Sequence, residues 1–76
     1  NISNFSVIND TSVLKTNIQI DPFVDIRENC KINDNVVIQS NCKIGPNVVI
    51  GENSIIYSNS NLQDCIIGSN CVIPKR

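Results

Sequence analysis

Four cysteines carry the most reactive side chains of this 76-residue chain. Thiolates bind zinc or pair in disulfides, but the chain has no C-x-x-C motif and no histidine to complete a zinc site. All four occupy one position of a six-residue repeat, two residues before an aliphatic residue: Cys30, Cys42, Cys65 and Cys71. We expect free thiols that pack as small apolar side chains, with a metal site or a disulfide as the alternative. No metal-binding residue is predicted.

Carboxylates are the other groups that could do chemistry, and they are spread along the chain: Asp21, Asp25, Glu28, Asp34, Glu52 and Asp64. We expect them at outward positions, without a converging acid–base pair. The chain also lacks a Gly-rich phosphate loop, a Ser/His/Asp set and a Cys/His set. We therefore predict no catalytic residue and no cofactor-binding residue within it.

The charge balance argues against several classes of partner. A net charge of −1, from 6 basic and 7 acidic residues, gives no basic patch for nucleic acid and no polybasic face for a membrane. No apolar run approaches the length of a membrane span, and no signal-peptide pattern opens the chain. Because the first residue is Asn1 rather than Met, we expect a fragment of a longer, cytoplasmic protein.

The elements that position these residues are predicted by a period of six. From Ile2 to Leu62 every sixth residue is Ile or Leu, and after one five-residue step the series resumes at Ile67 and Ile73. This spacing fits neither the helical period of 3.6 nor the alternation of long strands. It fits a short strand followed by a corner, repeated along the chain. The sequence therefore predicts an all-β fold.

Asparagine marks the corners of this repeat. Eight of the thirteen asparagines lie three residues before an aliphatic of the series: Asn17, Asn29, Asn35, Asn41, Asn47, Asn53, Asn59 and Asn70. Asparagine tolerates a left-handed backbone conformation better than other non-glycine residues, because its short amide bonds locally. We expect one turn with positive φ in each repeat.

Two stretches resemble the motifs of hexapeptide-repeat transferases: Ile44-Gly-Pro-Asn-Val-Val-Ile50-Gly-Glu-Asn-Ser and Ile67-Gly-Ser-Asn-Cys-Val-Ile73. The resemblance covers nearly the whole chain and implies a left-handed parallel β-helix of about four triangular coils, each built from three hexapeptides. Residues eighteen apart then stack in inner columns. We expect a single β-helix unit over residues 1–76, with a less regular first coil over 1–19 and regular coils over 20–73.

In this geometry the residue just before each aliphatic of the series points outward. Two of the three outer faces then carry apolar residues, which are candidates for trimer contacts: Val37, Val49, Ile55, Ile66 and Val72. Scattered surface valines are normal in soluble proteins, but a contiguous outer stripe more often marks an interface. Our hypothesis is a homotrimer assembled through the edge that joins these two faces.

Two phenylalanines lie eighteen residues apart and should stack on one corner. Phe5 and Phe23 occupy the position that elsewhere holds asparagine. They are interpreted either as a local aromatic pair that covers one end of the helix or as a docking point for a preceding domain.

A narrower resemblance suggests the parent protein. The stretch from Asn17 to Ile26 and the five-residue step from Leu62 to Ile67 resemble the β-helix of the bifunctional N-acetylglucosamine-1-phosphate uridyltransferase/glucosamine-1-phosphate N-acetyltransferase. The resemblance implies a parent that makes UDP-N-acetylglucosamine for peptidoglycan and lipopolysaccharide synthesis. Its substrates are sugar phosphates and nucleotides, and it uses acetyl-CoA and magnesium.

Under this interpretation the present chain is a trimerisation scaffold without a complete active site, because the family's catalytic histidine lies in later coils. The alternative is a structural or regulatory β-helix of a sugar-1-phosphate nucleotidyltransferase or a nucleotide-exchange-factor subunit. A third possibility is another hexapeptide acyltransferase.

Overall fold

The computed structural model describes residues 2–74, which contain short strands and no helix. Each strand has two residues, and corners of three or four residues separate consecutive strands. The strands are β1 (Val7–Ile8), β2 (Val13–Leu14), β3 (Gln19–Ile20), β4 (Asp25–Ile26), β5 (Lys31–Ile32), β6 (Val37–Ile38), β7 (Lys43–Ile44), β8 (Val49–Ile50), β9 (Ile55–Ile56), β10 (Asn61–Leu62), β11 (Ile66–Ile67) and β12 (Val72–Ile73). In this part of the chain no helix is long and apolar enough to cross a membrane.

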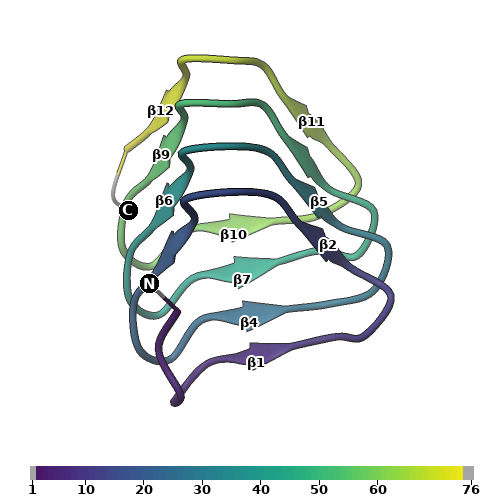
Figure 1. Ribbon diagram of the computed structural model, residues 1–76, viewed down its shortest axis with the longest axis vertical. Helices are drawn as coiled ribbons and strands as arrows, with labels where there is room; N and C mark the ends of the chain where they lie inside the picture. Colours follow the sequence, from purple (N-terminus) through teal and green to yellow (C-terminus); the bar gives the residue numbers. More distant parts are fainter. Residues whose placement is uncertain (1, 75–76) are drawn as a thin grey trace.

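The strands form three four-stranded parallel sheets, ordered β1-β4-β7-β10, β2-β5-β8-β11 and β3-β6-β9-β12. Each strand pairs with the strand three places further along the chain, so the chain winds as a parallel β-helix of about four triangular coils (Figure 1). This architecture is consistent with the left-handed β-helix of hexapeptide repeats. Ile20 lies opposite Ile38, and Ile38 lies opposite Ile56, which places residues eighteen apart in one column. The predicted fold class and inner columns are confirmed.

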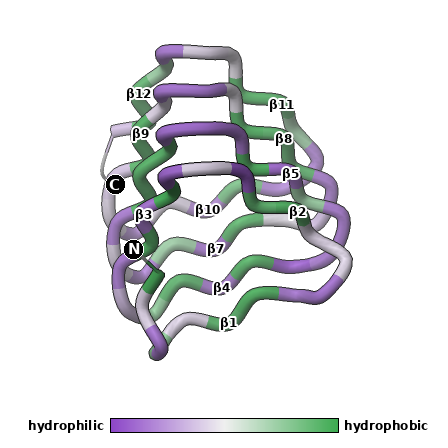
Figure 2. The backbone as a smooth tube through the Cα atoms, in the orientation of Figure 1, coloured by the Kyte–Doolittle hydropathy of each residue, from purple (hydrophilic) through white to green (hydrophobic). Residues whose placement is uncertain are grey.

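The core is the stack of aliphatics that the period of six predicts. The series residues from Ile20 to Ile56 are at most 1% exposed. Ile18 and the valines, cysteines and serine two residues before the later series residues are also buried. Figure 2 shows hydrophobic residues recurring along the strands and hydrophilic residues at the corners. The series residues of the first and last coils are only half-buried: Ile8, Leu14, Leu62, Ile67 and Ile73. Strand pairing is already regular in the first coil, because β1 pairs with β4 and β2 with β5.

The corners adopt the predicted left-handed conformation. All eight asparagines of the corner position have φ between 57° and 65°. This conformation turns the amide towards the preceding coil, where the N–H of Asn53 donates to the carbonyl of Asp34 at 2.9 Å. Phe23 and Asp64 fill the same position with φ of 67° and 51°, whereas Phe5 and Thr11 in the first coil do not have positive φ. The prediction of a positive-φ turn is thus confirmed from Asn17 onward.

Candidate functional site

Three flat outer faces surround the β-helix, and each bears one outward residue per coil. Face 1 is the outer side of β1, β4, β7 and β10, with Val7, Asp25, Lys43 and Asn61. Face 2 is the outer side of β2, β5, β8 and β11, with Val13, Lys31, Val49 and Ile66. Face 3 is the outer side of β3, β6, β9 and β12, with Gln19, Val37, Ile55 and Val72.

The structure gathers the predicted contact residues into two apolar columns. On face 3, Val37 pairs with Ile55 and Ile55 with Val72, and on face 2, Val49 pairs with Ile66. Ile66 is 79% exposed and Val72 56%, while the other three side chains are half-buried by their neighbours on the same face. The most exposed residue of each column is the one in the last coil, Ile66 on face 2 and Val72 on face 3. Their contact with another subunit stays a prediction.

The edge between faces 2 and 3 carries polar side chains that join neighbouring coils by hydrogen bonds. The Asp34 carboxylate accepts a hydrogen bond from the backbone N–H of Thr16, at 2.9 Å, and so joins two coils. The side-chain amide of Asn33 donates to the carbonyl of Ile50 at 2.8 Å, and this bond joins the second coil to the third. Apolar columns beside a rigid polar edge have the composition of a protein interface, with an apolar centre and a polar rim.

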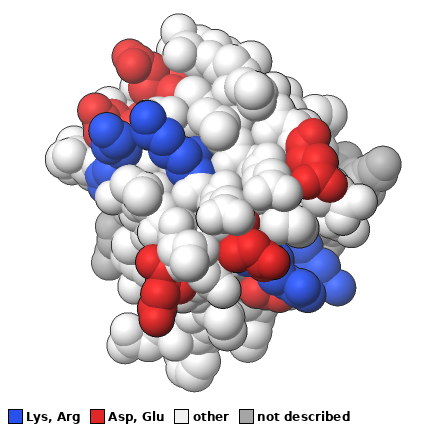
Figure 3. Space-filling model, turned by 90° about the vertical axis from the view of Figure 1, so that its right-hand side faces the viewer, with Lys and Arg blue, Asp and Glu red and all other residues white. Residues whose placement is uncertain are grey.

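Charged groups are mixed on the side of the molecule that includes face 2. Figure 3 shows basic side chains directly beside acidic ones in two places, with uncharged surface between the two places. At the corner between faces 1 and 2, Arg27 forms an ion pair with Asp25 at 3.2 Å. Both side chains are more than a third exposed, so the pair adds little to stability. This side carries no single-sign field that would select a highly charged partner.

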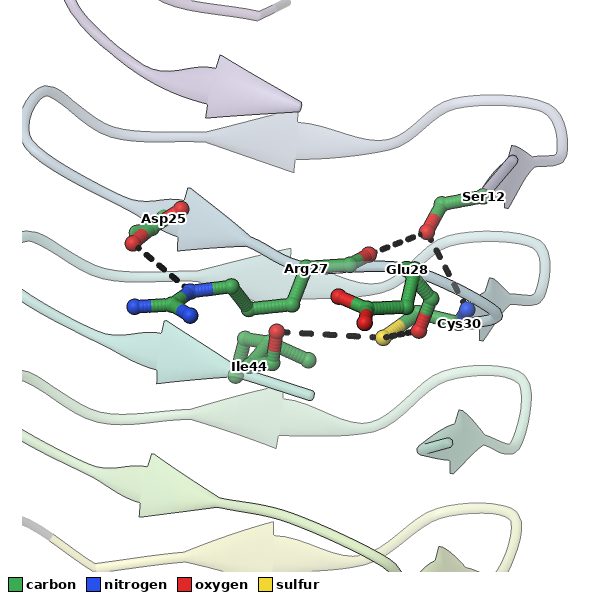
Figure 4. Close-up of polar contacts among 6 residues, drawn as sticks. All are labelled: Ser12, Asp25, Arg27, Glu28, Cys30 and Ile44. Carbon is green, nitrogen blue, oxygen red and sulfur yellow. Dashed lines mark hydrogen bonds and ion pairs between the residues drawn. The ribbon is translucent and has the colours of Figure 1, made fainter. Parts of the chain in front are cut away.

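The four cysteines are free thiols in the interior position that the repeat predicts. The Cys42 thiol lies 3.1 Å from the carbonyl of Tyr57, and that of Cys30 lies 3.7 Å from the carbonyl of Ile44 (Figure 4). Burial raises the pKa of the Cys42 thiol, which disfavours the reactive thiolate. Among residues 2–74, no three His, Cys, Asp or Glu side chains are grouped as a metal site.

Serines in the same interior position make contacts that sequence reasoning missed. The Ser12 hydroxyl donates to the carbonyl of Arg27 at 2.6 Å and accepts the backbone N–H of Cys30 at 3.1 Å (Figure 4). The Ser54 hydroxyl likewise donates to the carbonyl of Gly68 and accepts the N–H of Cys71. Each serine therefore bridges two coils through a pair of hydrogen bonds, and we call this arrangement a serine rung. The sharing of one position by serine and cysteine was the sequence signal for this role.

The N-terminal end carries a shallow depression and an aromatic pair. The depression has a volume of about 270 Å³ and is lined by Ser3, Gln19, Ile20, Asp21 and Pro22. Phe5 and Phe23 contact each other as predicted, with ring centroids 6.1 Å apart, and both are more than 60% exposed. The pair therefore covers little of the core, and docking of another domain against it stays a prediction.

The repeats match a known family. The model of the bacterial transferase hexapeptide family, described as six repeats, matches residues 11–46 and 29–63. Together these segments span more than half of the chain, which therefore belongs to the hexapeptide-repeat transferase family. No curated protein matches the chain.

Solved structures agree on the architecture. The structure of a UDP-N-acetylglucosamine acyltransferase from Arabidopsis superposes on 96% of this chain with a TM-score of 0.83 and 14% sequence identity. At that identity the likeness concerns the fold. The present chain covers 29% of the length of the Arabidopsis protein.

Proposed function

We propose that this chain is the trimerisation scaffold of a hexapeptide-repeat acyltransferase. Three copies pack side by side through faces 2 and 3, with their polar edges between them. The scaffold holds the subunits of the parent enzyme in register, and the chain itself contributes no catalytic group. The observation that carries this proposal is the pair of outward apolar columns, Val37–Ile55–Val72 and Val49–Ile66.

Side chains at the outward positions of the strands are exposed to solvent on the isolated chain, so an apolar column there gains more from being covered than a polar one. The matching positions of face 1 in the last three coils hold Asp25, Lys43 and Asn61, so the repeat tolerates polar residues there. Two of three faces nevertheless carry aliphatics, and Ile66 and Val72 expose most of their surface to water. Burying those side chains between copies removes an unfavourable contact with water. Hexapeptide-repeat transferases usually form trimers, which supports the choice of a three-fold assembly.

For the parent we propose the bifunctional enzyme that makes UDP-N-acetylglucosamine, with this chain as the first coils of its acetyltransferase domain. Acetyl-CoA, magnesium, sugar phosphates and nucleotides would then be bound outside this chain, in the cytoplasm. The likeness to the fold of an acyltransferase favours acyl transfer over the alternative, a regulatory β-helix of a sugar-1-phosphate nucleotidyltransferase or an exchange-factor subunit. A histidine followed by basic residues in the next coils of the parent would support acetyl transfer, and termination within a coil would contradict it.

A matched pair of lysine substitutions tests the trimer. Ile66→Lys places a charge on the apolar column of face 2, and Asn61→Lys places the same charge on face 1 of the same coil. Both positions are exposed, so neither change should unfold the chain. We expect Ile66→Lys to dissociate the trimer and Asn61→Lys to leave it intact, as measured by light scattering after size exclusion. A parent protein that is monomeric, or a trimer that survives Ile66→Lys, would contradict the proposal.

A further inference from the structure

Lys31 lies between two aliphatic side chains on face 2. It pairs with Val13 in the first coil and with Val49 in the third, and its side chain is exposed. Within residues 2–74 its ammonium group belongs to no ion pair. Under the proposed function another copy covers Val49, and the same copy then comes close to Lys31. Because burial of an unpaired charge is costly, the covering surface must supply an acceptor for the ammonium group.

Face 2 has no such acceptor on its strands. Its other outward residues are Val13, Val49 and Ile66. Two copies that met through face 2 alone would set each lysine against an aliphatic side chain or against the other lysine. An unpaired charge of this kind selects against the wrong contact, so face 2 is suited to a different face of the neighbour.

Face 3 offers a carboxylate. Asp21 directly follows β3, and its carboxylate accepts a hydrogen bond from the side-chain amide of Gln19 at 3.3 Å. Gln19 is the outward residue of β3, so this bond holds the carboxylate beside face 3. Among the described residues Asp21 has no cationic partner within ion-pair distance. Face 3 thus bears an unpaired negative charge, whereas face 2 bears an unpaired positive one.

The other carboxylates that border face 3 lie on its opposite edge. Asp34 and Glu52 belong to the corners between faces 2 and 3. Asp34 comes three residues after Lys31, but within the described part of the chain the two form no ion pair. The Asp34 carboxylate accepts the backbone N–H of Thr16 instead. Asp21 is therefore the carboxylate that a neighbouring copy presents from the far side of face 3.

We propose that face 2 of each copy docks on face 3 of the next copy, with the Lys31 ammonium group bound to the Asp21 carboxylate of that neighbour. This inference rests on the proposed trimer and specifies its contacts. Asp21 begins the second coil, to which Lys31 also belongs, so in copies that stand side by side the two groups differ in height by less than one strand spacing of about 4.8 Å. Because face 2 meets face 3, the contact is heterologous and closes into a ring of three.

The ion pair also fixes the register of the copies. The positions equivalent to Asp21 in the next two coils hold Gln39 and Tyr57, which carry no negative charge. A shift of one copy along another by one coil would therefore leave Lys31 without its partner. In the correct register the column Val49–Ile66 faces the column Val37–Ile55–Val72 of the neighbour. Charge thus selects the arrangement, and the aliphatics supply most of the buried surface.

The first experiment reverses the two charges in the full-length protein. Lys31→Glu and Asp21→Lys should each weaken the trimer about tenfold to a hundredfold, because like charges then meet three times in every trimer. The double variant Lys31→Glu/Asp21→Lys restores the attraction and should return the association constant to within about threefold of the unaltered protein. Lys43→Glu makes the same change at the same repeat position on face 1 and should have no effect. Analytical ultracentrifugation over a concentration series measures the equilibrium.

The second experiment needs no substitution. A water-soluble carbodiimide joins a lysine amine to a carboxylate that the amine contacts. Within one chain the corner between β3 and β4, which carries Asp21, lies on the opposite side of the triangle from β5, which carries Lys31 (Figure 1). A covalent link between the two residues therefore reports contact between copies. We expect the 21–31 link in the peptides of the cross-linked trimer, identified by mass spectrometry.

Three outcomes would overturn this proposal while leaving the trimer in place. The single reversals associate as strongly as Lys43→Glu, the double variant is no stronger than the weaker single variant, or the cross-linked trimer contains a 31–34 link and no 21–31 link. A full-length protein that is monomeric before any substitution would contradict the proposed function itself. The two failures are therefore distinguishable.

Discussion

An isoleucine in the second or third coil is sealed from water, whereas the same residue type in the last coil is half exposed. Ile38 is 0% exposed, and Ile73 in the same inner column is only partly buried. Both residues end a two-residue strand and occupy the same position in the repeat. The difference lies in the number of coils that cover them. In a solenoid, burial is thus supplied by neighbouring repeats and not by the repeat itself.

Truncation of the inner column should show the largest contrast between the middle and the end. We expect Ile38→Ala to lower the free energy of unfolding by about 2–5 kcal/mol, because it leaves a cavity between two coils. Ile73→Ala should cost about 1–2 kcal/mol, since part of that side chain already contacts water. Urea denaturation at low protein concentration measures both. Equal losses would mean that Ile73 is covered in solution.

Alanine substitutions at two glycines in equivalent positions should show the next largest difference in stability. A Cβ at Gly51 would lie 2.5 Å from the backbone of Gly68 and of Ser69, whereas a Cβ at Gly68 would meet only the Cys71 sulfur at 3.6 Å. Gly51→Ala should therefore destabilise the chain by about 1–3 kcal/mol by pushing two coils apart. Gly68→Ala should be close to neutral. Thermal unfolding of the two variants provides the comparison, and a neutral Gly51→Ala would show that the last coil is loosely held.

The serine rungs should give a smaller effect. Ser54→Ala removes a donor to Gly68 and leaves the N–H of Cys71 without its acceptor in a partly buried place, which should cost about 1–2 kcal/mol. The Ser60 hydroxyl bonds within its own coil, to the carbonyl of Tyr57, so Ser60→Ala should cost about 0.5–1.5 kcal/mol. Hydrogen exchange at Cys71 should rise only in Ser54→Ala. Similar exchange in both variants would argue against a rung between coils.

The aromatic corner should give the smallest effect. Phe23→Asn relieves a bulky residue at φ of 67° but breaks the ring contact with Phe5, and the two effects should offset to within about 0.5 kcal/mol. Phe5→Ala loses the contact without relieving the turn and should cost about 0.5–1.5 kcal/mol. Denaturant midpoints separate the two cases. A strongly destabilising Phe23→Asn would mean that the pair matters more than the backbone strain.

The fold was predictable because the period of six and the clustered asparagines encode it locally. An aliphatic such as Ile44 must face inward whichever coil it belongs to, and Asn47 must turn the chain at the same point of every repeat. The serine rungs were not predictable in the same way. Ser54 bridges two coils whereas Ser60 bonds within one, although both occupy the same position of the repeat, so the sequence of one repeat does not distinguish them.

Only part of the candidate interface could be predicted from the sequence, for a similar reason. The outward position of Val49 or Ile55 follows from the residue that comes after it, and the structure confirms their alignment in columns. What covers these columns depends on other molecules. Ile66 is also more exposed than Val49, which has a paired strand on both sides, and the sequence of a single repeat does not show this difference.

The stacking of residues eighteen apart limits how the length of such a chain can change during evolution. Inserting one hexapeptide would rotate every later residue by one face, so that apolar and charged outer columns would be scrambled while the inner aliphatics remained in place. Whole coils can be gained or lost without that penalty. The shortened step between Leu62 and Ile67 is the other permitted change, since β11 still pairs with β8 and a single deletion is absorbed within one corner. Viable length variants of this scaffold should therefore differ by complete turns or by single residues at corners.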